Sequence, residues 1–471
     1  MTRPLKSVHI TNYYHKNSGG ISTSFNNLLA AAERHERPVR LIVPGKTESV
    51  EDVNEFAKIY YVPAKKSPVF DKRYRVMMPW QYMASDSIIR RILLEEKPDI
   101  VEVTDKYTLA PIGAMIRTNN FKKLGRPMLV HFSCERMDDN VRSFLTNGRF
   151  GSWLSRRVIG NYTIPSFDFH IANSTYTAEE FFDSVSSEKN PHRSGFIFNK
   201  CWKLLRAPNV PVDERIFVCP RGVDASRFTP ERQSDEVKRE MRELASGSKD
   251  SILMFYAGRI SPEKNVGLLV DLMKILAQDD RDFRLLVAGD GPRKDWLKTQ
   301  CEKIAPGKVV LLGHLDKERL ANFYANADIF VHPNPKEPFG IAPLEAMASG
   351  VPTVAPNGGG ILSYATNENA WLVEPKGATF ASAVQEIANN GDLKRSKVQK
   401  ALETARTNTR EASTDRLLST YDKMFEDFLT RNNSYVGAEK PKGFDYWQLV
   451  KVIVVFTIFS VLEYLDIFDQ I

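Results

Sequence analysis

The chain has 471 residues, 42% of them apolar and 26% charged, a composition typical of a globular protein with two or three domains. The net charge of +7 comes from the first half, because residues 1–216 hold 32 Lys and Arg against 23 Asp and Glu, whereas the remainder holds 33 against 35. A basic surface suits nucleic acid, anionic lipid or a phosphorylated substrate, or serves only solubility, and the absence of any nucleic-acid-binding motif excludes nucleic acid as the expected partner.

The cysteines and the N-terminus indicate a reducing compartment. The start, MTRPLKSVHITNYY, turns directly into a strand-like run without a long apolar region, so we expect no signal peptide. Four cysteines occur without CxxC or His/Cys ligand spacing and predict neither a disulfide framework nor a metal site: Cys134, Cys201, Cys219 and Cys301.

Strand-like and helix-like stretches alternate along the chain. The first series of short apolar runs is LKSVHIT, VRLIVP, DIVEVTD, MLVHFS and DFHIANS, and the second is SILMFYAGR, FRLLVAGD, VVLLGHL, ADIFVHP and VPTVAPN. Helical stretches between the runs predict parallel sheets, hence an α/β protein with two Rossmann-like doubly wound domains facing a cleft. We expect the following segments: a first domain at 1–216, a second domain at 217–410, a helix at 411–430 that returns toward the first domain, a linker at 431–446 and an apolar helix at 447–468.

Loops at the carboxyl ends of the strands are the expected ligand sites. Gly19-Gly20 follows the first strand and precedes a helix, which suits an anion or simply makes a tight turn. The pattern is not G-x-G-x-x-G, so a nicotinamide or flavin cofactor is disfavoured. Arg259 and Lys264 leave a strand of the second series and could converge on a diphosphate, although two solvated loop cations would look the same.

The stretch EPFGIAPLEAMASGVPTVA sets two carboxylates eight residues apart. Glu337 heads a turn, Gly340 permits close backbone approach, and the helix that starts near Pro343 offers free N–H groups. Glu345 lies inside the apolar run LEAMA and needs polar partners, which the vicinal hydroxyls of a ribose would supply. The alternative is an acid placed to complement the helix macrodipole.

Taken together, SGGIS, GRISPEKN, VAGDGP, LLGHL, YANADIFVHP and the stretch above resemble, in order, the family 4 retaining glycosyltransferases, which have the GT-B fold. The resemblance implies a nucleotide-diphosphate sugar donor, no cofactor and no metal, in keeping with the lack of a DxD motif. It also implies site residues. By this resemblance we expect Glu337 to touch the donor sugar and Arg259 and Lys264 to bind the diphosphate. The expected donor-binding residues are Gly19, Gly20, Gly289, Gly340, Ile341 and Glu345.

A histidine near the reacting sugar is the remaining catalytic candidate. His131 in PMLVHFSCERMDDN is that candidate, but relatives read HER where this chain has Cys134-Glu135-Arg136, and a buried structural histidine remains the alternative. Charge builds on the diphosphate during transfer, so cations and helix dipoles should supply most of the catalysis. The sequence Arg221-Gly222-Val223-Asp224 resembles the subgroup that makes glycosylated diacylglycerols, but it also resembles subgroups with other acceptor classes.

We therefore expect a retaining hexosyltransferase that acts on a membrane-linked acceptor, lipid or polyprenyl, at the cytoplasmic face of a membrane. The alternatives are a transferase for a soluble sugar and a non-catalytic nucleotide-sugar-binding subunit. Residues 447–468, WQLVKVIVVFTIFSVLEYLDIF, are expected to attach the chain to the membrane surface, by spanning it or lying in it, although a helix packed on the protein would also fit. The basic first half would then face an anionic leaflet.

Overall fold

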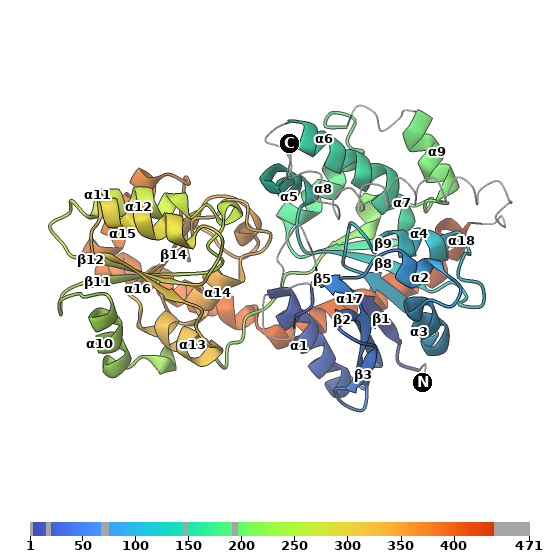
Figure 1. Cartoon of the computed structure of the whole chain (residues 1–471), viewed down its shortest axis with the longest axis horizontal. Helices are drawn as coiled ribbons and strands as arrows, with labels where there is room; N and C mark the ends of the chain where they lie inside the picture. The colour runs from blue at the N-terminus through green and yellow to red at the C-terminus, as the bar shows by residue number, and fades with distance from the viewer. Residues whose placement is uncertain (1–2, 16–19, 67–74, 145–148, 191–195, 438–471) are drawn as a thin grey trace. The chain divides into compact units, whose positions relative to one another are not determined.

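The computed structural model describes residues 3–15, 20–66, 75–144, 149–190 and 196–437. The chain divides into two compact units (Figure 1). Unit 1 comprises the described parts of Met1–Cys219 and Thr414–Ile471, and unit 2 comprises Pro220–Ser413. Each unit is built on a parallel sheet with helices on both faces, which confirms the prediction of two doubly wound α/β domains.

Unit 1 contains a sheet of eight strands in the order β10-β9-β8-β7-β1-β2-β4-β3, all parallel except the β3–β4 pair. Strands β1, β7, β8 and β9 are buried along their whole length, which explains their continuous apolar runs. The strand bounds are β1 Ser7–Ile10, β2 Val39–Gly45, β3 Ser49–Asp52, β4 Ala57–Pro63, β7 Ile100–Val103, β8 Met128–Ser133, β9 Phe169–Ala172 and β10 Ile216–Val218, with a separate ribbon of β5 Lys65–Lys66 and β6 Arg75–Val76.

Helices cover both faces of the unit 1 sheet. One core cluster joins α1 and α17 to the sheet, and another joins α2, α3 and α4 to it. Helix α8 begins with a capping box between Ser174 and Thr177. The helices are α1 Gly20–Arg34, α2 Trp80–Met83, α3 Ile88–Glu96, α4 Pro111–Arg117, α5 Met137–Phe144, α6 Arg149–Val158, the π-helix Ile159–Thr163, α7 Ile164–Ser166, α8 Thr175–Val185, α9 Phe196–Leu204, the 3-10 turn Asp213–Arg215, α17 Arg410–Thr430 and α18 Asn432–Val436.

Unit 2 contains a parallel sheet of six strands in the order β13-β12-β11-β14-β15-β16. The strands are β11 Ile252–Ala257, β12 Phe283–Ala288, β13 Val309–Gly313, β14 Ile329–Val331, β15 Thr353–Pro356 and β16 Trp371–Val373. Strand order reverses between β11 and β14, and a doubly wound sheet opens a crevice at the carboxyl ends of the two strands where this happens.

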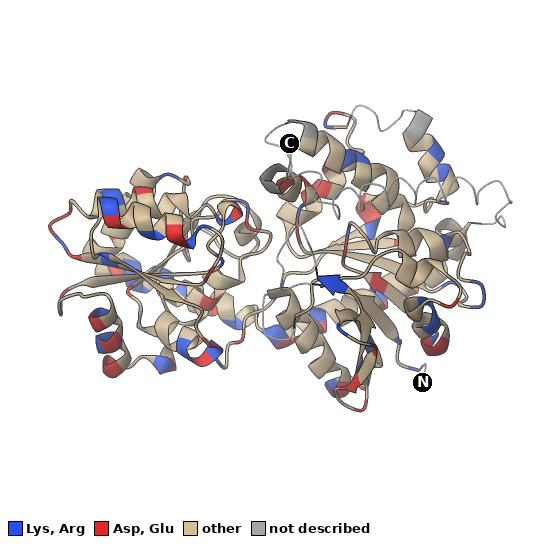
Figure 2. Cartoon of the chain, in the orientation of Figure 1, with Lys and Arg blue, Asp and Glu red and all other residues tan. Residues whose placement is uncertain are grey.

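The helices of unit 2 also lie in two layers. Helices α11, α12 and α15 share one core cluster with the sheet, and α10, α13, α14 and α16 share the other. The bounds are α10 Asp235–Leu244, α11 Gly267–Leu276, α12 Lys294–Ile304, α13 Lys317–Asn326, α14 Ile341–Ala348, α15 Gly377–Asn389 and α16 Gly391–Thr407, with 3-10 turns η4 Pro230–Arg232, η5 Pro262–Lys264 and η6 Gly360–Ser363. Charged residues of both signs occur on the helices of each unit (Figure 2).

The polypeptide passes from unit 1 to unit 2 and back through two adjacent segments. Val223 forms a parallel bridge with Thr409, and its backbone accepts a hydrogen bond from the N–H of Arg410 at 2.9 Å. Helix α17 starts there and continues into unit 1, where the Tyr421 hydroxyl donates to the buried Glu102 carboxylate.

The end of the chain differs in one respect from the predicted linker at 431–446. Residues 432–436 form α18, because Tyr435 is fully buried against Phe169 and its hydroxyl bonds Asp427. The predicted apolar helix at 447–468 lies outside the described residues. Within the described ranges, no helix has the length and apolar character needed to cross a membrane.

Candidate functional site

Two polar loops of unit 2 follow the strands β11 and β14, where the strand order reverses. The loop after β11 ends in Lys264, and the loop after β14 carries Glu337. Although 73 residues apart in sequence, the two side chains form an ion pair, with Lys264 Nζ at 2.8 and 3.0 Å from the two carboxylate oxygens of Glu337. The fold therefore brings together two of the residues singled out from the sequence.

Neighbouring polar groups hold this pair in place. The Asn334 amide donates to Glu337 Oε2 at 2.9 Å, and His332 Nε2 lies 3.7 Å from the same oxygen. The Asn265 side chain donates to the backbone carbonyl of Pro333 at 2.9 Å, which ties the loop after β11 to the loop after β14. These hydrogen bonds link the two loops into one surface, here called the floor, which carries Lys264, His332 and Glu337.

The electrostatics of the floor fix its protonation state. Burial alone raises the pKa of a carboxyl group, but the charge of Lys264, then His332 and the hydrogen bonds lower the pKa of Glu337 to about 2. Burial lowers the pKa of His332 to about 4, against the attraction of Glu337. At neutral pH the floor therefore holds an ionised carboxylate and a neutral imidazole. The Glu337 side chain is 14% exposed and the Lys264 side chain 28% exposed.

Arg259 lies on the same loop as Lys264. It follows β11 by two residues, its side chain is partly exposed, and its backbone carbonyl accepts a hydrogen bond from the Tyr256 hydroxyl at 2.9 Å. Gly289, after the neighbouring strand β12, packs against this loop with φ at +139°, and a Cβ on it would lie 1.8 Å from the Gly258 carbonyl oxygen. Only glycine fits such an approach.

The other donor-side residues of the prediction lie at the start of α14. Gly340 is the N-cap residue, with φ at +86°, and Ile341 opens the helix, so the free N–H groups of the first turn follow the Glu337 loop directly. Glu345 is partly buried one turn further on. Burial, reinforced by the charge of Asp224, raises the pKa of Glu345 to about 8, so this carboxyl group is largely protonated at neutral pH.

A glycine-rich loop that was not predicted to belong to the site supports the Glu337 turn. Residues 357–360, NGGG, follow β15, and the Gly360 N–H donates to the Glu337 carbonyl at 2.6 Å. A Cβ on Gly360 would lie 2.0 Å from the Pro338 carbonyl oxygen, so a side chain there would displace the loop. The sequence contains a pattern that could have predicted this loop, because three glycines closely follow the apolar run VPTVAP.

In unit 1, the structure gives a less complete account of the predicted residues. Gly20 is the first residue of α1, whereas Gly19 lies outside the described residues. The Ser22 hydroxyl in the first turn of α1 accepts a hydrogen bond from the His15 backbone N–H at 2.9 Å. This contact brings the start of α1 back to the segment that follows β1.

His131 lies in the core of unit 1. Its ring has no exposed surface and sits 5.3 Å from the Phe167 ring and 5.8 Å from the rings of His170 and Phe181. Among the residues that the structure describes, neither ring nitrogen has a hydrogen-bond partner. Burial, then the charge of His170, lowers its pKa well below the ordinary value. This placement favours the packing alternative and argues against contact between His131 and a sugar.

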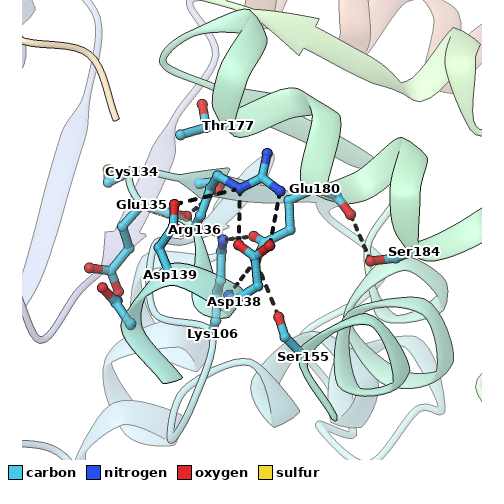
Figure 3. Close-up of polar contacts among 12 residues, drawn as sticks. Lys106, Cys134, Glu135, Arg136, Asp138, Asp139, Ser155, Thr177, Glu180 and Ser184 are labelled. Atoms are coloured by element: carbon cyan, nitrogen blue, oxygen red, sulfur yellow. Dashed lines mark hydrogen bonds and ion pairs between the residues drawn. The ribbon is translucent and has the colours of Figure 1, made fainter. Parts of the chain in front are cut away.

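A polar network that spacing could not reveal lies at the carboxyl end of β8 (Figure 3). Its centre is the ion pair of Lys106 Nζ with Glu180 Oε2 at 2.5 Å, in which both side chains are almost fully buried. Arg136 is held by Asp138 through two hydrogen bonds of 2.9 and 3.0 Å. The described residues contain no group of three or more His, Cys, Asp or Glu side chains that could hold a metal ion.

Comparisons with known proteins match both units. A family model described as "Glycosyl transferase 4-like domain" matches residues 19–190, and one described as "Glycosyl transferases group 1" matches residues 237–404. The chain is similar to the GDP-mannose-dependent alpha-(1-6)-phosphatidylinositol dimannoside mannosyltransferase of Mycobacterium tuberculosis, with 26% identity over 395 residues, 83% of this chain and 90% of the relative.

Two further similarities agree with these matches. A GDP-mannose-dependent alpha-mannosyltransferase of Corynebacterium glutamicum is 25% identical over 367 residues, 76% of this chain and 74% of the relative. Among solved structures, the sucrose-phosphate synthase of Thermosynechococcus elongatus superposes with a TM-score of 0.66 at 16% identity, covering 90% of this chain and 100% of that one. At such low identity the structural match speaks for the fold alone.

Proposed function

The chain belongs to the family 4 glycosyltransferases with the GT-B fold and is a sugar-transferring enzyme, and on this premise we propose that it moves a hexose from a nucleotide-diphosphate sugar to a membrane-linked acceptor with retention of anomeric configuration. The observation that carries the proposal is the pair of Lys264 and Glu337 at the reversal point of the unit 2 sheet, 2.8 Å apart and open in part to solvent.

The pair suits the chemistry of the donor. Cleavage of the bond between the anomeric carbon and the diphosphate leaves negative charge on the diphosphate, which Lys264, Arg259 and the first turn of α14 would stabilise. Glu337, ionised and held by Asn334, would accept hydrogen bonds from hydroxyl groups of the sugar. In this proposal the carboxylate of Glu337 binds the sugar, and the cations stabilise the departing diphosphate.

Glu345 would hold the nucleotide ribose. Its carboxyl group lies on α14, one turn beyond the residues assigned to the phosphates, as a ribose next to a diphosphate requires. Because its pKa is raised to about 8, it would approach the ribose as a neutral acid that both donates and accepts hydrogen bonds.

We further propose GDP-mannose as the donor and a phosphatidylinositol-type glycolipid as the acceptor. The support is the similarity, over 83% of the chain, to a relative named for those two compounds. Attachment to the cytoplasmic face of a membrane is proposed from the apolar segment 447–468 together with the excess of Lys and Arg in residues 1–216.

The test is a transfer assay with purified full-length protein in mild detergent. GDP-mannose, UDP-glucose and UDP-galactose are each offered with phosphatidylinositol, phosphatidylinositol mannosides or diacylglycerol, and the product anomer is read by NMR. Lys264→Ala serves as the inactive control, and Lys376→Ala, which breaks an exposed ion pair with Glu374, as the active one. Transfer with inversion, or transfer only to soluble sugars, would overturn the corresponding part of the proposal.

A further inference from the structure

Unit 1 has its own reversal of strand order, between β1 and β7. Three loops leave the carboxyl ends of β1, β7 and β8 there, and they carry Tyr13, Lys106 and Glu135 respectively. A crevice at this position is where a doubly wound domain binds its ligand. Apart from the predicted Gly19-Gly20 loop, the residues assigned to the donor lie on unit 2, so the carboxyl ends of the unit 1 strands are a candidate place for the acceptor.

A buried ion pair between Lys106 and Glu180 supports the loop after β8. Lys106 Nζ donates to the backbone carbonyl of Glu135 and lies 2.5 Å from Glu180 Oε2. The other Glu180 oxygen accepts the Asp138 backbone N–H at 3.0 Å and the Ser155 hydroxyl at 3.3 Å. Because a buried charge must be fully paired, this network fixes the backbone on both sides of Arg136.

The guanidinium group of Arg136, on the loop after β8, is held by contacts within unit 1. Arg136 makes the two hydrogen bonds to Asp138, donates to the Tyr176 carbonyl at 2.8 Å and stacks on the Tyr176 ring at 4.6 Å. It is 8% exposed, so it is not available to an acceptor phosphate without breaking these contacts.

Glu135 is placed differently. Its side chain is partly exposed, and one oxygen, Oε1, accepts a hydrogen bond from the Tyr13 hydroxyl at 3.0 Å. The other oxygen has no partner among the described residues. Burial, with Glu135 next in effect, raises the pKa of Tyr13 well above its ordinary value, so the phenol stays a neutral donor. The loop therefore presents one oriented carboxylate with an open acceptor atom.

We propose that Glu135, oriented by Tyr13, binds a hydroxyl group on the polyol ring of the acceptor, a sugar or a cyclitol. The proposal rests on the proposed function and extends it to the acceptor side. A carboxylate accepts hydrogen bonds from hydroxyl groups and repels a phosphate, so Glu135 recognises the ring and not the lipid phosphate. Lys106 and Glu180 are positioning residues, since they act only through the loop.

The test compares Glu135→Gln with Glu51→Gln in the full-length protein. Glu51 is the matched control, because its carboxylate is also partly exposed and accepts from a tyrosine hydroxyl, that of Tyr61 at 2.8 Å, but it lies on β3 at the far edge of the sheet. The probes are myo-inositol and methyl α-mannoside, titrated by saturation-transfer NMR in the presence of GDP. Thermal unfolding checks that each variant is folded.

We expect Glu135→Gln to weaken binding of at least one probe about tenfold or more, the usual effect of removing a charge-assisted hydrogen bond, while Glu51→Gln and the affinity for GDP stay unchanged. Wild-type affinity for both probes in Glu135→Gln, or no binding of either probe to the wild type, would overturn the proposal. A loss of GDP affinity would assign Glu135 to the donor instead and would overturn it equally.

Measurements of sugar transfer distinguish the role proposed for Glu135 from the proposed function on which it rests. If the wild-type protein transfers sugar to a lipid, Glu135→Gln should raise the KM for that lipid. If the wild type transfers to no membrane-linked acceptor, the proposed function fails, and the titrations still decide whether Glu135 binds a polyol ring.

Discussion

Replacing Lys264 with Met should destabilise unit 2 in a pH-dependent manner. The substitution keeps an unbranched apolar stem and removes the ammonium group that lies 2.8 Å from Glu337. The folded-state pKa of Glu337 is about 2, against an ordinary value of 4.5, and this difference corresponds to about 3 kcal/mol of stability at neutral pH. Lys264 is the largest of the groups that lower this pKa, so we expect a substantial part of this stabilisation to depend on it.

The sign of the pH dependence follows from the lowered pKa. The carboxylate contributes its stabilisation above pH 4.5, and the contribution is lost as the pH falls from 4.5 toward 2. We therefore expect urea unfolding at pH 7 to show a loss of about 2 to 3 kcal/mol for Lys264→Met. At pH 3 the difference from the wild type should shrink to about 1 kcal/mol.

Lys376→Met is the control, because Lys376 and Glu374 form a Lys–Glu pair of 2.6 Å with both side chains more than half exposed. An exposed pair contributes little, so this variant should show no measurable change at either pH. An equal loss for Lys264→Met at pH 7 and pH 3, or no loss at pH 7, would refute the reasoning.

Other predictions concern the donor loops and the C-terminus. Glu337→Gln should lower the rate of transfer about 100-fold or more in steady-state assays while leaving circular dichroism unchanged, and near-normal turnover would contradict a sugar contact. The raised pKa of Glu345 makes wild-type stability fall as pH rises from 4.5 through 8, so Glu345→Gln should lose less Tm between pH 5 and pH 8.5; equal losses would contradict this. Gly360→Val should abolish GDP binding measured by calorimetry, because its Cβ would clash with a carbonyl oxygen, and retained binding would show that the loop adapts. Deletion of 440–471 should release the protein from the membrane pellet with GDP-mannose binding intact; a full-length protein already soluble without detergent would contradict the anchor.

The doubly wound architecture could be predicted because it depends on short patterns of residues along the sequence. Strands buried on both faces must be continuous apolar runs, and the helices between them are long enough to impose parallel pairing. Residues 432–436 escaped prediction for the opposite reason. The stretch NNSYV has no helical apolar pattern, and tertiary contacts hold it: Tyr435 is buried against Phe169, and the backbone carbonyl of Tyr435 accepts a hydrogen bond from Arg117.

The candidate site divides in the same manner. Lys264, Glu337 and Glu345 belong to motifs whose residue types already suggest a ligand, so the sequence alone makes them candidates. Lys106 and Glu180, 74 residues apart, have no meaning until the fold brings them together in the core. His131 shows the converse limit, because β8 is buried along its whole length and a histidine within it looks the same in sequence whether it faces a ligand or the core.

The double passage of the chain between the units has a consequence for how the protein is made. Unit 2 is one continuous segment, Pro220–Ser413, and can fold on the ribosome as soon as it emerges. Unit 1 cannot be completed at that stage, because the Glu102 carboxylate in its sheet accepts a hydrogen bond from the Tyr421 hydroxyl on α17, and α17 follows unit 2 in the sequence. We expect the donor half to mature first during translation, and unit 1 to remain a client of chaperones until α17 arrives.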